Sequence, residues 1–379
     1  MHSLLDWLRP RERAMTRLLG RFVRAESPSF DKAAVDRFGR IVASEWKRRG
    51  ATVTLLRQRL HGDHVRAEWR PSGNRTAAQI LVLGHLDTVY DAGTITRMPF
   101  RVSRKRAWGP GTFDMKGGLA IALYAVDALA AVGCMPEKRV VFLWTSDEEI
   151  GSESSRAAIE REARRSDAVL VLEPAAGLDG RVKTGRKGVG EIELIATGRA
   201  VHAGLNPEDG INAIEEIAFQ IARISRWNQP RRGITVNAGV IEGGTRTNVI
   251  PERARVLVDL RAARVDDMRA LERKFRALRP VLPGAKLEVR GGFNRPPMER
   301  KMSAALYSRA RALSKEMGLT LGEAFVGGGS DGNFTSALGV PTLDGLGAIG
   351  EGAHSPRENI IVRALPERAA LLAGLVMTL

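Results

Sequence analysis

The chain has 379 residues, which favours two domains, and its 44% hydrophobic and 27% charged residues are typical of a soluble globular protein without a membrane partner. The formal net charge is +16, but arginines stand beside acids at helical spacing and the aromatic residues (5%) do not interleave with them, so solvated helix surfaces are favoured over a nucleic-acid interface. The single cysteine, Cys134, excludes an intramolecular disulfide framework, and the N-terminus lacks the apolar core of a secretory signal, so we expect a cytoplasmic protein.

Strands and helices are predicted to alternate in the first half of the chain. Residues 11–50 favour two amphipathic helices, and 119–132 a buried helix. An alternating segment at 51–60 is followed by a loop at 71–76. Continuous apolar runs, which suit strands covered on both faces, occur at 78–89, 139–146 and 167–174, with a helix predicted at 155–166. This order predicts an α/β fold with a mainly parallel sheet flanked by helices.

The pattern changes near residue 182. Residues 191–198 and 254–262 alternate apolar and polar side chains, as strands with one wet face do. Helices are predicted at 211–227, where isoleucines repeat at helical spacing, and at 265–278, before a strand at 286–292. We therefore predict a small α+β domain inserted into the larger one. The expected parts are 1–183, 184–294 and 295–379.

Acids and histidines follow the ends of three successive predicted strands. The carboxyl ends of strands in open α/β sheets are where ligands bind. Two further candidates are Asp114, in a glycine-rich loop, and His354, near the C-terminus. The full set is His85, Asp87, Asp114, Glu148, Glu149, Glu173 and His354. Singly, each suits a core histidine, a helix cap or an ordinary turn. Together, five carboxylates at one sheet edge repel one another unless a cation lies among them.

Histidine and carboxylate ligands suit zinc or a similar divalent ion. If two ions share one ligand, we expect Asp114 to be that bridging ligand. His85 and Glu173 would then bind one ion, and Glu149 and His354 the other. Cobalt and manganese are the alternatives to zinc. We expect Asp87 to orient the His85 imidazole, and Glu148 to act as general base in metal-assisted hydrolysis. Asp147 is left without a role.

Seven motifs stand in the order and spacing of a known family: GHLDTV, GPGTFDMKGG, TSDEEIGS, LEP, HAG, GGGSDGN and AHSP. The chain resembles the di-zinc exopeptidase family of glutamate carboxypeptidase, acetylornithine deacetylase, succinyl-diaminopimelate desuccinylase, aminoacylase and peptidase T. The similarity covers essentially the whole chain. It is greatest to the glutamate carboxypeptidase branch, in which the ligand matching Glu173 is also a glutamate rather than an aspartate.

The resemblance implies the same metal ligands and general base, a cis peptide after Asp114, and an inserted domain that serves as lid and homodimer interface. It also implies that His202 reaches the partner subunit's active site and stabilises the oxyanion. Asn248 and Arg261 match positions that bind the substrate carboxylate or help the oxyanion. Arg181 and Arg295 are further candidates for substrate binding, although the loop around Arg295 departs from the carboxypeptidase pattern.

The sequence thus predicts a hydrolase that cleaves an amide or peptide bond next to a free carboxylate through a metal-bridged hydroxide. One alternative is an N-acyl-amino-acid deacylase or desuccinylase, which shares the mechanism and differs in its pocket. An alternative of another class is a non-catalytic metal-dependent binding protein. The presence of Glu148 counts against this last one, because a binder needs the metal ligands but not the base.

Overall fold

The computed structural model describes residues 1–70 and 78–379, so the loop predicted at 71–76 lies outside the described residues. The chain forms two compact units, called here the first and the second unit. The first unit comprises Met1–Gly185, Glu299–Val326 and Ser330–Leu379, and the second unit comprises Arg186–Met298 and Gly327–Gly329. The domain boundaries expected from the sequence, at residues 184 and 294, stay a prediction.

A six-stranded sheet forms the centre of the first unit, with strand order β1-β2-β6-β3-β7-β14. The strands are β1 (Thr52–Leu56), β2 (His64–Trp69), β3 (Gln79–His85), β6 (Arg139–Thr145), β7 (Ala168–Val171) and β14 (Thr342–Leu343). Strands β6, β3, β7 and β14 run parallel, and only β2 pairs antiparallel with both of its neighbours. The predicted mainly parallel α/β sheet is confirmed, although β2 was not predicted.

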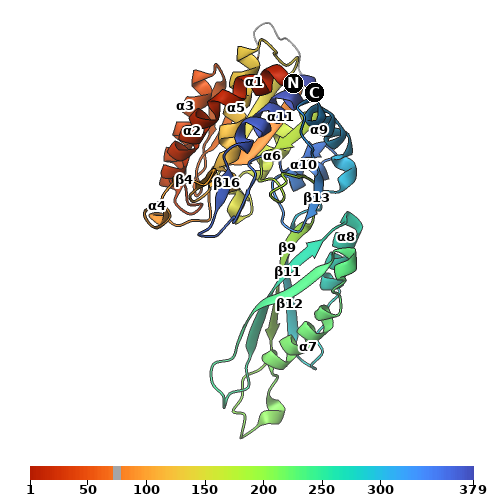
Figure 1. The fold of residues 1–379 in the computed structure, drawn as a ribbon. Helices are drawn as coiled ribbons and strands as arrows, with labels where there is room; N and C mark the ends of the chain where they lie inside the picture. Colours follow the sequence, from red (N-terminus) through yellow and green to blue (C-terminus); the bar gives the residue numbers. More distant parts are fainter. Residues whose placement is uncertain (71–77) are drawn as a thin grey trace. The chain divides into compact units, whose positions relative to one another are not determined.

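Helices cover both faces of this sheet (Figure 1). Along β3, Ile80 and Val82 face one cluster of apolar side chains, while Leu81 and Leu83 face another. The larger cluster is completed by α1 (His2–Leu8), α2 (Glu12–Arg24), α3 (Lys32–Arg48), α5 (Gly117–Ala131), α9 (Ala304–Glu316) and α11 (Ala364–Thr378). The smaller one is completed by α6 (Arg156–Ala163) and α10 (Gly332–Ala337). Burial on both faces explains why β3, β6 and β7 are continuous apolar runs.

Short strands at the rim of the first unit bring distant segments together. A four-stranded sheet has the order β15-β16-β5-β4. Its strands are β4 (Arg101–Ser103), β5 (Arg106–Trp108), β15 (Gly350–Glu351) and β16 (Asn359–Ile361). The other short elements are α4 (Thr94–Arg97), β8 (Val182–Arg186) and β13 (Glu323–Val326). Pairing of β16 with β5 places the turn that carries His354 beside the glycine-rich loop that follows β5.

The second unit has an antiparallel sheet with strand order β10-β11-β9-β12. Its strands are β9 (Gly188–Thr197), β10 (Thr235–Gly243), β11 (Arg253–Ala262) and β12 (Lys286–Arg295), and its helices are α7 (Ala213–Ser225) and α8 (Val265–Arg276). Ile217 and Ile224 of α7 join the core of this unit, but Ile214 is 38% exposed, so the predicted isoleucine stripe is only partly a core stripe.

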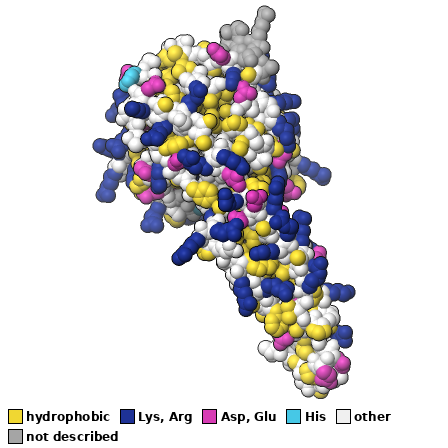
Figure 2. Space-filling view, turned by 90° about the vertical axis from the view of Figure 1, so that its right-hand side faces the viewer, with side chains coloured by type: hydrophobic (Ala, Val, Ile, Leu, Met, Phe, Trp, Pro, Cys, Tyr) yellow, Lys and Arg dark blue, Asp and Glu magenta, His cyan; other side chains and the backbone are white. Residues whose placement is uncertain are grey.

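Surface charge and hydropathy complete the description of the molecule. On the face drawn in Figure 2, lysine and arginine side chains are spread over the surface with acidic residues among them. Within residues 1–70 and 78–379, we find no helix of the length and apolar character needed to span a membrane. Cys134 packs, partly buried, against the larger apolar cluster.

Candidate metal centre

Strand register brings the predicted ligands to one edge of the central sheet. His85, the last residue of β3, lies opposite Thr145 at the end of β6, so the acids that follow β6 emerge beside it. Leu83 lies opposite Val171 in β7, which places Glu173, two residues farther on, level with His85. The convergence of these strand ends follows from parallel pairing.

The two nitrogens of His85 have different surroundings. Its side chain is buried, with Nε2 3.3 Å from Asp114 Oδ1 and 3.4 Å from Glu173 Oε1. On the other side of the ring, Nδ1 lies 3.0 Å from the carbonyl oxygen of Asp87 and 3.4 Å from its Oδ1. Asp87 therefore faces the nitrogen that points away from the other acids, which is the arrangement expected of a residue that fixes a ligand's ring.

Asp87 also fixes the turn that carries the paired glutamates. Its fully buried carboxylate accepts hydrogen bonds from the backbone N–H groups of Glu148 (3.3 Å) and Glu149 (3.2 Å). Ser29 Oγ donates a third hydrogen bond at 2.8 Å. One residue thus holds the His85 ring, chiefly through its backbone carbonyl, and the backbone of the two glutamates through its carboxylate.

Asp114 offers each carboxylate oxygen to a different histidine. Oδ1 lies 3.3 Å from His85 Nε2, and Oδ2 lies 3.4 Å from His354 Nε2. His354 Nε2 is also 3.2 Å from Glu149 Oε2. The peptide bond between Asp114 and Met115 is cis, as the resemblance implied. This arrangement makes Asp114 the shared member of two groups of side chains.

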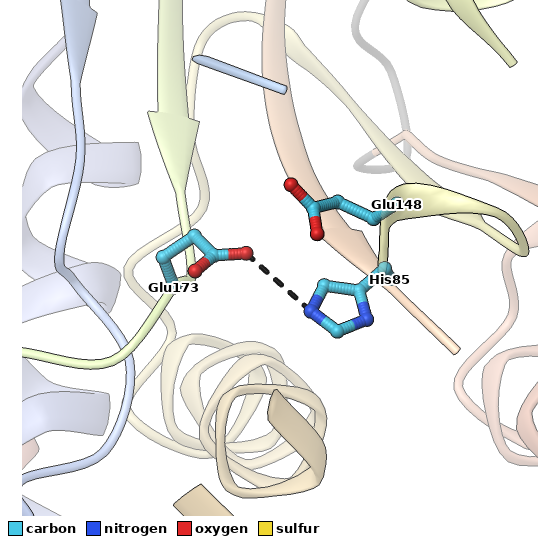
Figure 3. Close-up of side chains that lie close together, drawn as sticks. All are labelled: His85, Glu148 and Glu173. Carbon is cyan, nitrogen blue, oxygen red and sulfur yellow. Dashed lines mark ion pairs between the residues drawn. The ribbon is translucent and has the colours of Figure 1, made fainter. Parts of the chain in front are cut away.

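Glu148 points into the same space as His85 and Glu173, as Figure 3 shows. Ligand atoms of His85, Glu148 and Glu173 lie within 4.8 Å of one another, and so do those of His85, Asp114 and Glu149. All seven residues predicted for the site are therefore close to its centre or in contact with it.

The spacing of these atoms fits a divalent ion. Two ligand atoms bonded at about 2.1 Å to a tetrahedral zinc ion are roughly 3.4 Å apart. The nitrogen–oxygen separations of 3.2–3.4 Å agree with this spacing. In addition, Glu149 Oε1 is buried without a hydrogen-bond partner among the described residues, which leaves one strong acceptor for an ion.

The acids of the cluster make it a cation-binding environment. Hydrogen bonds to Asp114 and Glu149 raise the pKa of His354 to about 10, although this side chain is half exposed. Burial alone would lower the pKa of His85, but its contacts with Asp114, Asp87 and Glu173 raise it well above its usual value. The pKa of Asp114 is lowered because the histidine contacts outweigh its burial. Protons on the histidines thus balance charge that metal ions would balance instead.

Asp147, which had no predicted role, anchors the turn after β6. It is fully buried, and its Oδ2 accepts hydrogen bonds from Ser154 N (2.7 Å), Ser154 Oγ (2.7 Å) and Ser155 N (3.3 Å). Its carbonyl oxygen accepts from Ser152 N at 2.8 Å. The three acids of the DEE segment therefore differ in direction: the Asp147 side chain points into the protein, and the glutamates lie at the candidate metal centre. The only sequence signal was the serine-rich run at 152–155.

His202 and Asn248, predicted for oxyanion and substrate binding, are neighbours in the second unit. His202 is exposed, and its Nδ1 accepts a hydrogen bond from Gly204 N at 3.1 Å. The next residue, Ala203, donates its N–H to the carbonyl of Asn248 at 2.9 Å. The structure thus brings these two segments together in the second unit, while the roles of His202 and Asn248 remain predictions.

Arg261 and Arg181, two of the candidates for substrate binding, are paired with acids. Arg261 binds Asp259 through both Nε and an Nη atom, at 2.8–3.1 Å. Arg181, in the first unit, pairs with Asp179 at 3.1 Å. Arg295 is buried in the second unit. Recruiting Arg261 or Arg181 for a substrate carboxylate would require exchange of an existing partner.

Comparison with known proteins agrees with this geometry. Residues 81–378 match the peptidase family M20/M25/M40. Carboxypeptidase G2 from Pseudomonas sp. strain RS-16 is 32% identical over 375 residues, covering 97% of this chain and 89% of that protein. A succinyl-diaminopimelate desuccinylase from Dechloromonas aromatica is 28% identical over 322 residues, covering 80% and 84% of the two chains.

Solved structures show the same fold. Aminopeptidase PepT from Bacillus cereus superposes with a TM-score of 0.79 at 22% identity, covering 97% of this chain and 98% of that one. A dinuclear metal-binding peptidase of the M20 family from Bacillus subtilis gives a TM-score of 0.70 at 15% identity, covering 97% of each chain. With the family match and the carboxypeptidase relative, these findings confirm the predicted resemblance. The chain belongs to the peptidase family M20/M25/M40, as a metal-dependent enzyme of the exopeptidase and amidohydrolase type.

Proposed function

We propose that the protein is a carboxypeptidase-like hydrolase that cleaves an amide or peptide bond next to a free carboxylate. The observation that carries this proposal is Asp114, whose two oxygens face the Nε2 atoms of His85 and His354 at 3.3 and 3.4 Å. The 32% identity to carboxypeptidase G2 over nearly the whole chain supports the substrate class.

Two divalent ions would be held by these side chains, and zinc is the expected metal. His85 and Glu173 would bind one ion, Glu149 and His354 the other, and Asp114 both. When bound, the ions would act as Lewis acids toward the amide carbonyl and would acidify the attacking water. Asp87 would keep the ring of His85 in place through its contacts with Nδ1.

Glu148 would move the proton during the reaction. Its carboxylate points toward His85 and Glu173, from a turn whose backbone is held by Asp87 (Figure 3). As general base it would take a proton from the attacking water, and as general acid it would pass that proton to the leaving amine. One carboxylate can serve both steps because the proton it receives is the proton the amine needs.

A second copy of the chain would pair with the second unit. Strand β10 is one of the two edge strands of its sheet, and Val240 and Ile241 on it are 47% and 56% exposed. Phe219 of α7 is 47% exposed as well. An open edge strand with exposed apolar side chains is suited to symmetric pairing with a second copy. In such a homodimer His202 would serve the oxyanion of the partner's active site, and Asn248 with an arginine would bind the substrate carboxylate.

An N-acyl-amino-acid deacylase or desuccinylase is the second candidate, and the 28% identity to the succinyl-diaminopimelate desuccinylase favours it. A cytoplasmic location is part of the proposal and is supported by the single cysteine.

A panel of substrates separates the two functions. Purified protein reconstituted with Zn²⁺ would be given dipeptides ending in Glu, Asp or an aliphatic residue, beside N-acetyl and N-succinyl amino acids. We expect the highest kcat/KM on a dipeptide with C-terminal Glu. A preference for the N-acyl amino acids would replace the carboxypeptidase proposal with the deacylase.

A further inference from the structure

Glu358 is a buried carboxylate that the mechanism does not use. Glu358 is fully buried, and within the described residues it forms no ion pair with a lysine or arginine. It lies four residues after His354 and directly before β16. A buried charge without a cation is costly unless hydrogen bonds compensate for it, so the partners of Glu358 indicate its purpose.

Those partners belong to the loop that ends in Asp114. Glu358 Oε1 accepts hydrogen bonds from the backbone N–H groups of Phe113 (2.7 Å) and Asp114 (2.9 Å). Oε2 accepts from Gly111 N at 3.2 Å. Three backbone N–H groups of this loop thus bind one side chain. Charge-assisted hydrogen bonds of this kind are stronger and shorter than neutral ones.

Tyr90 connects the same carboxylate to the His354 turn. Its hydroxyl proton faces two acceptors, Glu358 Oε2 at 2.5 Å and the carbonyl oxygen of Ser355 at 3.0 Å, so one O–H group lies between the carboxylate and the turn. Ser355 follows His354, which has a left-handed φ of 59°. Such a backbone is uncommon for a residue other than glycine, although asparagine, aspartate and histidine adopt it more often than other residues do.

We propose that Glu358 and Tyr90 form a positioning pair that fixes Asp114 relative to His354. The inference rests on the proposed function, because it assigns the pair to the alignment of two metal ligands. Strand pairing of β16 with β5 brings the two segments together, with Gly109 N donating to the carbonyl of Glu358 at 3.3 Å. The Glu358 side chain adds hydrogen bonds between the two segments beyond this backbone bond, as far as Asp114.

A glutamine cannot replace Glu358 in this role. The carboxylate has two accepting oxygens, and each one faces N–H or O–H donors. An amide group keeps one acceptor and turns an N–H₂ group toward the remaining donors. The shape of the side chain is preserved, but either the Asp114 side or the Tyr90 side loses its hydrogen bonds. Glu358→Gln therefore tests the connection without creating a cavity.

The experiment compares two variants with two matched controls. Glu358→Gln and Tyr90→Phe alter the pair. Glu162→Gln changes another buried glutamate, which pairs with Arg66 at 3.0 Å, and Tyr307→Phe removes another hydroxyl, which lies 3.2 Å from the carbonyl of Leu321. For each protein we would measure the Tm without metal, the Kd for Zn²⁺ by competition with a chromophoric chelator, the Co²⁺ absorption spectrum, and kcat and KM.

We expect Glu358→Gln to weaken Zn²⁺ binding about 10- to 100-fold, as loss of a residue that orients ligands does. The Co²⁺ spectrum should change, and kcat should fall while KM stays within about threefold. Tyr90→Phe should shift the same quantities in the same direction by a smaller factor, and it keeps the test decisive if Glu358→Gln does not fold. The controls should leave the Kd and spectrum unchanged.

An unchanged Kd and Co²⁺ spectrum in folded Glu358→Gln or Tyr90→Phe, with only a lower Tm, would show a purely structural role and overturn the inference. Absence of metal binding by the unaltered protein would overturn the inference and the proposed function together. Metal binding that is normal in the unaltered protein but insensitive to both variants would overturn the inference alone.

Discussion

Asp114 and Glu148 illustrate how residues of the same chemical type acquire different roles from their surroundings. Asp114 faces two histidine nitrogens, one on each carboxylate oxygen. Glu148 follows the most buried part of β6, and its backbone is fixed by Asp87. Because the backbone of Glu148 is held independently of any ion, its side chain can be changed without moving the groups that face Asp114.

Glu148→Gln should separate metal binding from proton transfer. The amide preserves the size of the side chain but cannot accept a proton from water, so kcat should fall by about 10²- to 10⁴-fold. Zn²⁺ content, measured by atomic emission on the dialysed protein, should stay near that of the unaltered enzyme. If turnover persists, Glu148 is not the base; if metal content falls in parallel, Glu148 is a ligand.

At the scale of elements, the turn after β6 depends on a buried acid that binds no metal. Asp147 accepts two backbone N–H groups and the hydroxyl of Ser154. Asp147→Ala would remove the acceptor of these buried and partly buried donors, and we expect a loss of about 1 to 3 kcal/mol in the free energy of unfolding. Urea denaturation of the metal-free protein measures it. Asp179→Ala, at an exposed position, serves as control and should change stability little.

An Asp147→Ala variant as stable as the unaltered protein would mean that water or a rearranged turn replaces these hydrogen bonds. In that case the position of the glutamates would depend on Asp87 alone.

The sequence predicted elements well where burial determines composition. Strands β3, β6 and β7 are apolar on both faces and were predicted, as was the convergence of the residues at their ends. Strands β2 and β10 were missed. In β2, His64, Arg66 and Glu68 interrupt the pattern, and most of β10 is exposed. Strands of this kind are defined by their partners more than by their own composition.

The gathering of the candidate ligands was predictable because five like charges at one sheet edge have few explanations. The contacts of Asp147, Glu358 and Tyr90 were not, because each depends on which backbone groups lie within hydrogen-bond distance. Glu358 meets Phe113 and Asp114 across more than 240 residues of sequence. No local pattern encodes such contacts, which arise from the pairing of β16 with β5.

At the scale of the whole molecule, the proposed homodimer would bury the exposed apolar side chains of the edge strand β10. Ile241→Lys places a charge on β10, and we expect the dimer dissociation constant to rise at least tenfold, because burial of an unpaired lysine opposes association. Light scattering with size-exclusion chromatography measures the change. Val102→Lys, which alters an exposed apolar residue of the first unit, is the control. A monomeric unaltered protein at micromolar concentration would contradict the homodimer.

The most direct test of the metal centre is a titration of metal-free protein with Zn²⁺, following turnover of the best substrate from the panel. Protein stripped by a chelator should be inactive, and activity should return as Zn²⁺ is added, reaching a maximum near two equivalents per chain. Glu149→Ala and His354→Ala should need a large excess of Zn²⁺ to recover any activity. Full turnover by protein shown to be free of metal would contradict the account.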